Sequence, residues 1–229
     1  MVAPSLHVCP LGRMDYDRAF DLQLGLVDRL ARDEAATHGY LLLVEHPPTF
    51  TIGRSGSEAN VFASPKALAA RGARLVHVNR GGDVTFHGPG QIVAYPIVRL
   101  ERQSRDVHRY MRLLEEAIIR TLARFDVAGG RVQGYTGVWV GDEKVAAIGV
   151  AIRRWITYHG VAINLTTDLS YFDMICPCGI RDCRVTSLAR LVGRDVDWDN
   201  VAKSFAAEFA EVFGMAAVDT SFEKLLPDD

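Results

Sequence analysis

The order of helical and strand-like segments predicts an α+β fold. Segments with helical periodicity are interspersed with segments typical of strands, and after residue 135 the strand-like segments follow one another directly. Consecutive strands suit antiparallel pairing better than a doubly wound parallel sheet. No repeat or flexible linker divides the sequence. We therefore expect one domain over residues 1–229, with a mixed and largely antiparallel sheet and surrounding helices.

The N-terminal half is expected to contain two helices and three strands. Asp15 is a residue type that caps helices, and it precedes the first apolar periodic segment. Pro47-Pro48 ends the first apolar strand. Ser64-Pro65 is a typical helix start, and Gly72 a typical helix end. The expected helices cover about 15–36 and 65–72, and the expected strands cover 40–46, 74–79 and 91–98, the last two joined by a long glycine-rich connection.

The C-terminal half contains the clearest helix of the sequence. It begins near Asp106 and ends near Val127, with apolar residues at three- and four-residue spacing. A hairpin with its turn at Gly141-Asp142-Glu143 is expected next, followed by a strand over 157–165. The last helix is expected over 198–213, capped by Asp197 and followed by Gly214.

The composition is that of an ordinary globular protein. The chain has 26 Lys and Arg against 28 Asp and Glu, a net charge of −2, and therefore lacks the basic excess of a general nucleic-acid binder. No apolar run approaches the roughly 20 residues of a membrane span. The first residues lack the pattern of a signal peptide. We therefore expect a cytoplasmic protein that binds neither membrane nor nucleic acid.

Three of the four cysteines lie within eight residues, in the segment ICPCGIRDC. The C-x-C-x4-C spacing fits no common zinc or iron–sulfur site, so we expect no metal. Cys176 and Cys183 suit the alternative of small, buried apolar residues. Cys178 lies between Pro177 and Gly179, which fix a tight backbone and leave little side chain around the sulfur. Cys178 is therefore a candidate nucleophile, which a nearby cation would activate.

Three further features are candidates for the site. Lys144 follows the expected hairpin turn and is either a solvated surface lysine or a buried amine that acts on Cys178. The segment RGGDVTFHGPG lets the backbone approach a ligand closely, although it is also compatible with a long hairpin connection around His87. His159 is at least as compatible with a structural role as with a substrate contact.

These segments together resemble one family. RGGDVTFHGPGQIVAYP, Lys144 in KVAAIG, HGVAINL, and PCGI followed by VTSL occur in the order found in the lipoyl(octanoyl) transferases, the octanoyl-[acyl carrier protein]–protein N-octanoyltransferases. The resemblance extends over about residues 40–190, and the RGGxxTFHGPGQ segment is its most specific part.

The resemblance implies the fold of the biotin and lipoate protein ligases and an acyltransferase activity. By motif position, Cys178 is the nucleophile and Lys144 its partner. The residues that the resemblance implies for the acyl pocket are Arg80, Gly81, Gly82, Asp83, Val84, Thr85, Phe86, His87, Ala147, Ile148, Gly149, Gly160, Val161 and Ala162.

The implied reaction takes an octanoyl group from acyl carrier protein to a lysine of lipoyl domains, those of 2-oxoacid dehydrogenase complexes and of the glycine cleavage H protein. The thioester supplies the activation, so no cofactor is expected. An ATP-dependent lipoate–protein ligase of the same fold is the alternative, and a non-catalytic module with a zinc-binding cysteine cluster is a third interpretation. We expect a monomer, with a basic patch for acidic partners formed by Arg153, Arg154, Arg181 and Arg184.

Overall fold

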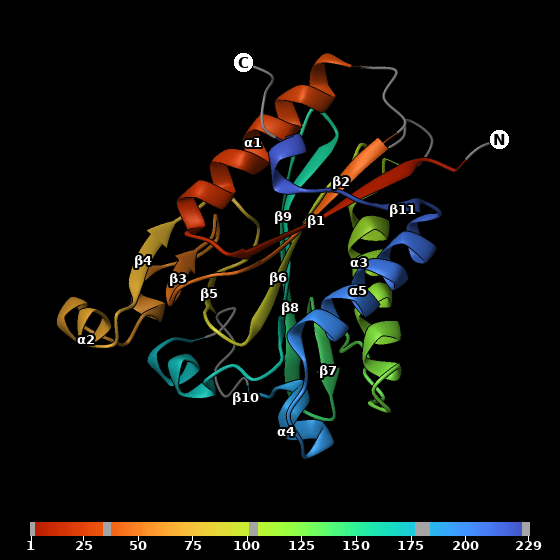
Figure 1. Ribbon diagram of the computed structural model, residues 1–229. Helices are drawn as coiled ribbons and strands as arrows, with labels where there is room; N and C mark the ends of the chain where they lie inside the picture. The colour runs from red at the N-terminus through yellow and green to blue at the C-terminus, as the bar shows by residue number, and fades with distance from the viewer. Residues whose placement is uncertain (1–2, 34–37, 101–104, 177–183, 226–229) are drawn as a thin grey trace.

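The computed structural model describes residues 3–33, 38–100, 105–176 and 184–225, which form a large sheet, a small sheet and the helices around them (Figure 1). The strands of the large sheet are β1 (Ser5–Arg13), β2 (His38–Glu45), β6 (Gln91–Ile97), β7 (Val138–Val140), β8 (Glu143–Arg153), β9 (Ile156–Asn164), β10 (Arg184–Val185) and β11 (Ala216–Asp219). The small sheet contains β3 (Thr49–Ile52), β4 (Arg74–His77) and β5 (Val84–His87). The α-helices are α1 (Tyr16–Arg32), α2 (Pro65–Ala70), α3 (Val107–Ala123), α4 (Leu188–Val192) and α5 (Trp198–Phe213), and short 3-10 helices cover Glu58–Asn60, Leu169–Met174 and Phe222–Leu225.

The large sheet is mixed, as predicted. Its strand order is β10-β8-β9-β6-β2-β1-β11, with β7 paired to β8. The pairs β2–β6, β6–β9, β8–β9 and β7–β8 are antiparallel. The pairs β1–β2, β1–β11 and β8–β10 are parallel. The central strands β8, β9, β6 and β2 are therefore antiparallel to their neighbours in this group. Parallel pairs lie at both ends of the sheet, where the sequence predicted mainly antiparallel pairing.

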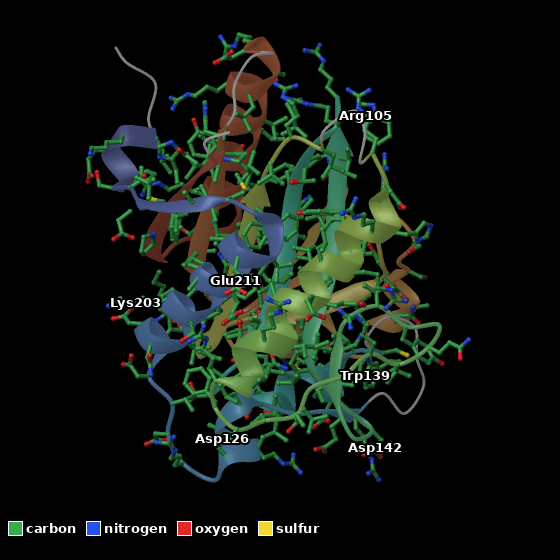
Figure 2. All side chains as sticks on the ribbon, turned by 90° about the vertical axis from the view of Figure 1, so that its right-hand side faces the viewer. Arg105, Asp126, Trp139, Asp142, Lys203 and Glu211 are labelled. Atoms are coloured by element: carbon green, nitrogen blue, oxygen red, sulfur yellow. The ribbon has the colours of Figure 1, made fainter. Side chains whose placement is uncertain are left out.

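Helices cover both faces of the large sheet. Helices α3 and α5 pack on one face, and Figure 2 views the molecule from that side. Helix α1 packs on the opposite face, where Leu26, Val27 and Leu30 are fully buried against β2, β6 and β9. The small sheet has its own core, with Phe50 and Phe86 in contact at 5.1 Å between ring centroids. The small sheet thus forms a second layer beside the α1 face.

Most helix and strand predictions are confirmed within a few residues, and the capping predictions are confirmed in part. The Asp106 carboxylate accepts a hydrogen bond from the Arg109 N–H, and Asp197 accepts one from the Asn200 N–H. Asp15 stands at the N-cap of α1, but its side chain makes no capping hydrogen bond.

The largest correction concerns the glycine-rich connection, which contains strand β5. Its four residues, Val84 to His87, are all β-branched or aromatic, and none is glycine. They pair with β3 in antiparallel register. The flanking glycines concealed this strand in the sequence. Strands β1, β3 and β11 were also not predicted, and each pairs only with segments distant in sequence.

Candidate active site

The floor of the main pocket is formed by small residues of two neighbouring strands. Ala147 of β8 pairs with Ala162 of β9, and two residues further along Gly149 pairs with Gly160. Residues two apart on a strand face the same side of a sheet, so both pairs lie on the face that α1 covers. They leave a pocket with about 460 Å³ of unfilled space, part of it open to solvent.

The glycine-rich segment covers this floor. The Gly81 N–H donates to the Val150 carbonyl at 2.8 Å, which fixes the segment to β8. The guanidinium of the buried Arg80 donates to the carbonyl and hydroxyl oxygens of Thr51, both at 2.8 Å. A Cβ atom at Gly149 would lie 2.9 Å from Arg80 Cδ. Glycine at this position therefore lets the arginine side chain lie directly over the floor.

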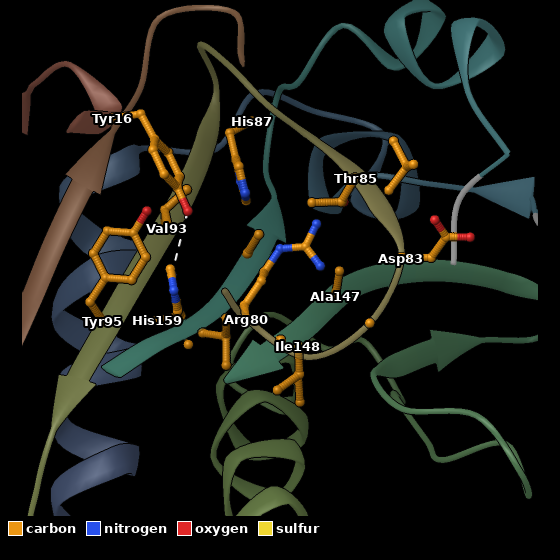
Figure 3. Close-up of a pocket in the computed structure, with 16 residues that line it drawn as sticks. Tyr16, Arg80, Asp83, Thr85, His87, Val93, Tyr95, Ala147, Ile148 and His159 are labelled. Atoms are coloured by element: carbon orange, nitrogen blue, oxygen red, sulfur yellow. Dashed lines mark hydrogen bonds between the residues drawn. The ribbon is translucent and has the colours of Figure 1, made fainter. Parts of the chain in front are cut away.

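Aromatic side chains close one end of the pocket. Figure 3 shows Tyr16 of α1, Tyr95 of β6 and His159 of β9 grouped at this end, with Thr85 and Ala147 at the other. The Tyr16 hydroxyl lies 3.4 Å from His159 Nδ1. His159 Nε2 lies 2.7 Å from Asn79 Oδ1. A neutral imidazole that donates through Nε2 to Asn79 leaves Nδ1 to accept from the tyrosine hydroxyl, so the polar atoms of this end are satisfied by one another.

His159 has an unusual backbone conformation for a residue inside a strand. Its φ is 55°, in the left-handed region. Neighbouring residues of a strand ordinarily face opposite sides, yet Tyr158 and His159 both contact the ring of Phe20 on α1. The irregular backbone therefore turns His159 towards the pocket.

Burial keeps three histidines of this region neutral. It lowers the pKa of His159 to about 3, with the nearby Arg80 cation acting in the same direction. Burial, and then His46, lower the pKa of His87 to about 3. Burial lowers the pKa of His46 to about 4. At neutral pH all three present uncharged rings, which suits an apolar ligand.

Lys144 lines a smaller cavity that adjoins the pocket. The residue is 4% exposed, which excludes the alternative of a solvated surface lysine. Thr85, Ala147 and Ala162 line both the small cavity and the pocket. The two spaces therefore meet at the end of the pocket opposite the aromatic wall.

A β-bulge sets the direction of Lys144. Val138 pairs with Ala146, whereas the next residue, Trp139, pairs with Lys144, so β8 carries one additional residue, Val145. A bulge of this kind redirects the side chains beyond it. Val145 and Ala146 both belong to the core under α3 and α5. Lys144 instead lines the cavity on the pocket side.

A chain of hydrogen bonds connects the pocket with the strand that carries Lys144. His87 Nδ1 lies 2.9 Å from Gln91 Oε1, and Gln91 Nε2 donates to Asn164 Oδ1 at 2.9 Å. Asn164 Nδ2 donates to the Thr186 carbonyl at 3.0 Å. The Thr186 N–H donates to the Lys144 carbonyl at 2.9 Å. These bonds hold β6, β9 and β10 in fixed positions around the small cavity.

The sequence is similar to a known family over most of its length. Residues 15–210 match the lipoyl protein ligase A/B catalytic domain. The chain is 45% identical over 219 residues to the octanoyltransferase of Thermoanaerobacter sp. (strain X514), covering 96% of this chain and 95% of that protein. It is 47% identical over 201 residues to the octanoyltransferase of Geobacter metallireducens, covering 87% and 89%.

The chain belongs to the octanoyltransferase family. The predicted family and enzyme class are thereby confirmed, and the non-catalytic interpretation is not supported.

Solved structures confirm the fold predicted for this octanoyltransferase. Lipoate-protein ligase A bound with ATP superimposes with a TM-score of 0.73 at 17% identity, covering 98% of this chain and 92% of that one. The biotin protein ligase from Aquifex aeolicus, in complex with biotin and ATP, gives 0.55 at 14% identity, covering 90% and 70%. At these identities the likeness shows the fold alone.

Most of the predicted pocket residues of the octanoyltransferase surround one space. Those that line the pocket are Arg80, Gly82, Asp83, Val84, Thr85, His87, Ala147, Ile148, Gly149, Gly160, Val161 and Ala162. Gly81 and Phe86 are not among the lining residues. The Phe86 ring stacks on Tyr171 at 4.3 Å in the core of the small sheet, because it alternates with Thr85 and His87 along β5. Cys178 and Cys183 lie outside the described residues, and Cys176 is buried as predicted.

Sequence reasoning missed Tyr16, Val93 and Tyr95, which also line the pocket. Val93 and Tyr95 alternate along a predicted strand, so a two-residue period was available as a signal. Tyr16 offered none, because its role depends on how α1 packs against the sheet.

The predicted basic patch is not formed by the described arginines. Arg184 pairs with the first residue of β8, whereas Arg153 is the last residue of that strand. The 11 residues of β8 separate these two arginines by about 30 Å, at about 3.3 Å per residue. Arg153 forms an ion pair with Asp28, and Arg184 forms one with Asp142 at 3.0 Å. Arg181 lies outside the described residues.

In the parts of the chain that the structure describes, no helix is both long and apolar enough to cross a bilayer. Among the same residues, no three His, Cys, Asp or Glu side chains are grouped so that they would hold a metal ion.

Proposed function

We propose that this octanoyltransferase moves an octanoyl group from the thioester of acyl carrier protein to the ε-amine of a lysine on a lipoyl domain, through an acyl thioester on Cys178. The acceptors we infer are the lipoyl domains of 2-oxoacid dehydrogenase complexes and the glycine cleavage H protein, in the cytoplasm. The supporting observation is the junction of two spaces, a pocket with a floor of small residues and a cavity lined by Lys144.

The dimensions of the pocket support an eight-carbon chain. From Ala162, beside the Lys144 cavity, to His159 at the aromatic end is about 10 Å along β9, at about 3.3 Å per residue. An extended octanoyl chain, with C–C bonds of about 1.5 Å, spans roughly 9 Å. Each methylene buried on this floor contributes about 0.8 kcal/mol to binding. The acyl chain would therefore place its carbonyl near Lys144 and its methyl group near Tyr16.

The reaction divides into two acyl transfers. In the first, the Cys178 thiolate attacks the thioester carbonyl, a C–S bond to Cys178 forms, and the C–S bond to the carrier breaks. The carrier thiolate leaves and takes up the proton that the Cys178 thiol lost when it ionised. In the second, the neutral amine of the acceptor lysine attacks the acyl-Cys178 carbonyl. The C–N bond forms, the C–S bond to Cys178 breaks, and Lys144 takes the proton that the attacking nitrogen loses.

The test is the intact mass of the protein after mixing with octanoyl-acyl carrier protein in the absence of ATP. The native chain should gain the mass of one octanoyl group, and Cys178→Ala should gain none. No gain in either protein would contradict the proposal. The same proteins would then be assayed with ATP and free octanoate or lipoate, because a lipoate–protein ligase, the alternative of the same fold, requires ATP and a free acid.

A further inference from the structure

The side chain of Lys144 is enclosed by residues of β7 and the turn before it. Residues 130–140 run along the edge of β8 and pair with it through β7. The Cβ position of Gly137 and the indole ring of Trp139 both lie close to the Lys144 side chain. Neither residue lines the acyl pocket. These two residues are therefore placed to act on the lysine side chain and not on the acyl chain.

Gly137 leaves the space that the lysine shaft occupies. A Cβ atom at this position would lie 3.1 Å from Lys144 Cε and 2.5 Å from the Ala146 carbonyl oxygen. The φ of Gly137 is 124°, a conformation that residues with a side chain rarely adopt. Any larger residue would therefore displace the lysine shaft, the strand, or both.

Trp139 covers the amine itself. Lys144 Nζ lies 5.0 Å from the centroid of the indole ring, within the range of a cation–π contact. Trp139 is 6% exposed, and Figure 2 shows it on the edge of the sheet near Asp142. Its buried Nε1–H has no hydrogen-bond partner within the described residues. A buried donor without a partner lowers the stability of the fold, and leucine or phenylalanine at this position would avoid that loss. Packing alone therefore does not explain why the residue is tryptophan.

A buried carboxylate fixes this segment to helix α3. Glu115 is 1% exposed, and its Oε1 accepts a hydrogen bond from the Gly137 N–H at 3.2 Å. Its Oε2 accepts from Arg112 at 2.7 Å and from Arg131 at 3.1 Å. Glu115 therefore determines where Gly137 lies, and through Gly137 where the lysine shaft can lie.

We propose that Gly137 and Trp139 are positioning residues of the transfer reaction, which hold the Lys144 amine at the mouth of the acyl pocket, and that Glu115 anchors them to α3. This inference rests on the proposed function, because it gives Lys144 a part in the reaction. We expect these residues to affect turnover and not acyl binding, because other residues form the floor of the acyl pocket.

The first test compares Trp139→Leu with Trp139→Phe. The leucine variant should lose about tenfold in kcat, the scale of a desolvated cation–π contact, while the KM for octanoyl-acyl carrier protein stays unchanged. The phenylalanine variant, which keeps an aromatic face, should recover most of the kcat. Equal kcat in both variants, or a loss confined to KM, would overturn the proposal.

The second test uses two glycines of the same segment as a matched pair. Gly137→Ala should lower kcat by about a hundredfold, the loss expected when a catalytic group is misplaced by about 1 Å. Gly134 has a φ of 85° but no atom within 4 Å of its Cβ position, so Gly134→Ala introduces similar backbone strain without touching Lys144. Equal kcat in the two variants would contradict the proposal. If Gly137→Ala does not fold, the tryptophan pair decides.

Lys144→Ala separates the failure of this inference from the failure of the proposed function. Full activity in Lys144→Ala would overturn this inference and the part of the reaction that we give to Lys144, whereas octanoyl transfer through Cys178 is overturned only if the native chain gains no octanoyl mass. An inactive Lys144→Ala together with fully active Trp139→Leu and Gly137→Ala would overturn the positioning role alone.

Discussion

His46, His87 and His159 occupy positions where an imidazole can form hydrogen bonds but cannot readily carry a charge. His46 Nδ1 lies 2.7 Å from the Met14 carbonyl, to which it donates, and its Nε2 lies 2.8 Å from the Tyr95 hydroxyl, from which it accepts. Both nitrogens are thus used by the neutral form. Protonation would add a charge to an interior that already contains the Arg80 guanidinium.

The pH dependence of stability follows from these histidines. Burial lowers the pKa of His46 to about 4, well below that of an unfolded histidine. Between about pH 6.5 and pH 4 the unfolded chain binds more protons than the folded one, so stability is lost as the pH falls, by up to about 1.4 kcal/mol per pH unit for each such histidine. Urea midpoints measured at pH 7.5 and 4.5 should show this loss.

His46→Gln should reduce the loss of stability between pH 7.5 and pH 4.5 by the contribution of one histidine, because glutamine does not titrate. A native chain whose urea midpoint is the same at both pH values would contradict the argument.

Strands β8 and β9 act as a unit that defines the length of the pocket. Their paired small residues recur every second position, and the next pair on the same face, Ala151 with Tyr158, ends the floor with a bulky ring. The length available to a ligand is thus set by where small side chains give way to a large one. The bulge at Val145 and the left-handed backbone of His159 lie at the two ends of this stretch.

Gly149→Ala should shorten the pocket. Its Cβ would lie 2.9 Å from Arg80 Cδ and 3.0 Å from the Gly81 carbonyl oxygen, so the methyl group would displace the Arg80 side chain into the pocket space beyond Ala147. We expect transfer of octanoyl to fall by at least about tenfold relative to butanoyl, since the loss of two to three buried methylenes costs about 2 kcal/mol. Rates with acyl carriers of both lengths measure this ratio. Gly25→Ala on α1, where no atom lies within 4 Å, should leave the ratio unchanged, and an unchanged ratio in Gly149→Ala would refute the assignment of the floor.

The large sheet joins the two ends of the chain. Strand β11 pairs with β1 in parallel, and β1 pairs with β2, so residues from both ends lie beside one another (Figure 1). The small sheet is inserted between β2 and β6 in sequence, and it shares the pocket with the large sheet. These connections favour one cooperative unit over two independent domains.

A single unfolding transition is therefore expected. Urea unfolding followed by far-UV circular dichroism and by tryptophan fluorescence should give coincident curves. The midpoint should not depend on protein concentration if the chain is a monomer. Separate transitions for the two probes would indicate that the small sheet unfolds independently.

Local patterns in the sequence were sufficient for the fold class and for most elements. The apolar period of α3 and the capping residues Asp106 and Asp197 act within one or two helical turns, so a single sequence contains them completely. The glycine-rich segment and the small residues around Gly149 and Gly160 were likewise visible, because they are contiguous motifs. These motifs also carried the resemblance that the family comparison confirmed.

The tertiary structure alone decided which way the site residues face. Lys144 faces the pocket because Val145 adds one residue to β8, and this bulge exists only in the pairing with β7. The aromatic end of the pocket requires Tyr16 of α1 to meet His159, 143 positions away in the sequence. Pairing and packing of this kind depend on contacts between distant segments, which no local pattern encodes. The sequence therefore identified the residue types of the site, and the fold determined the direction in which each one points.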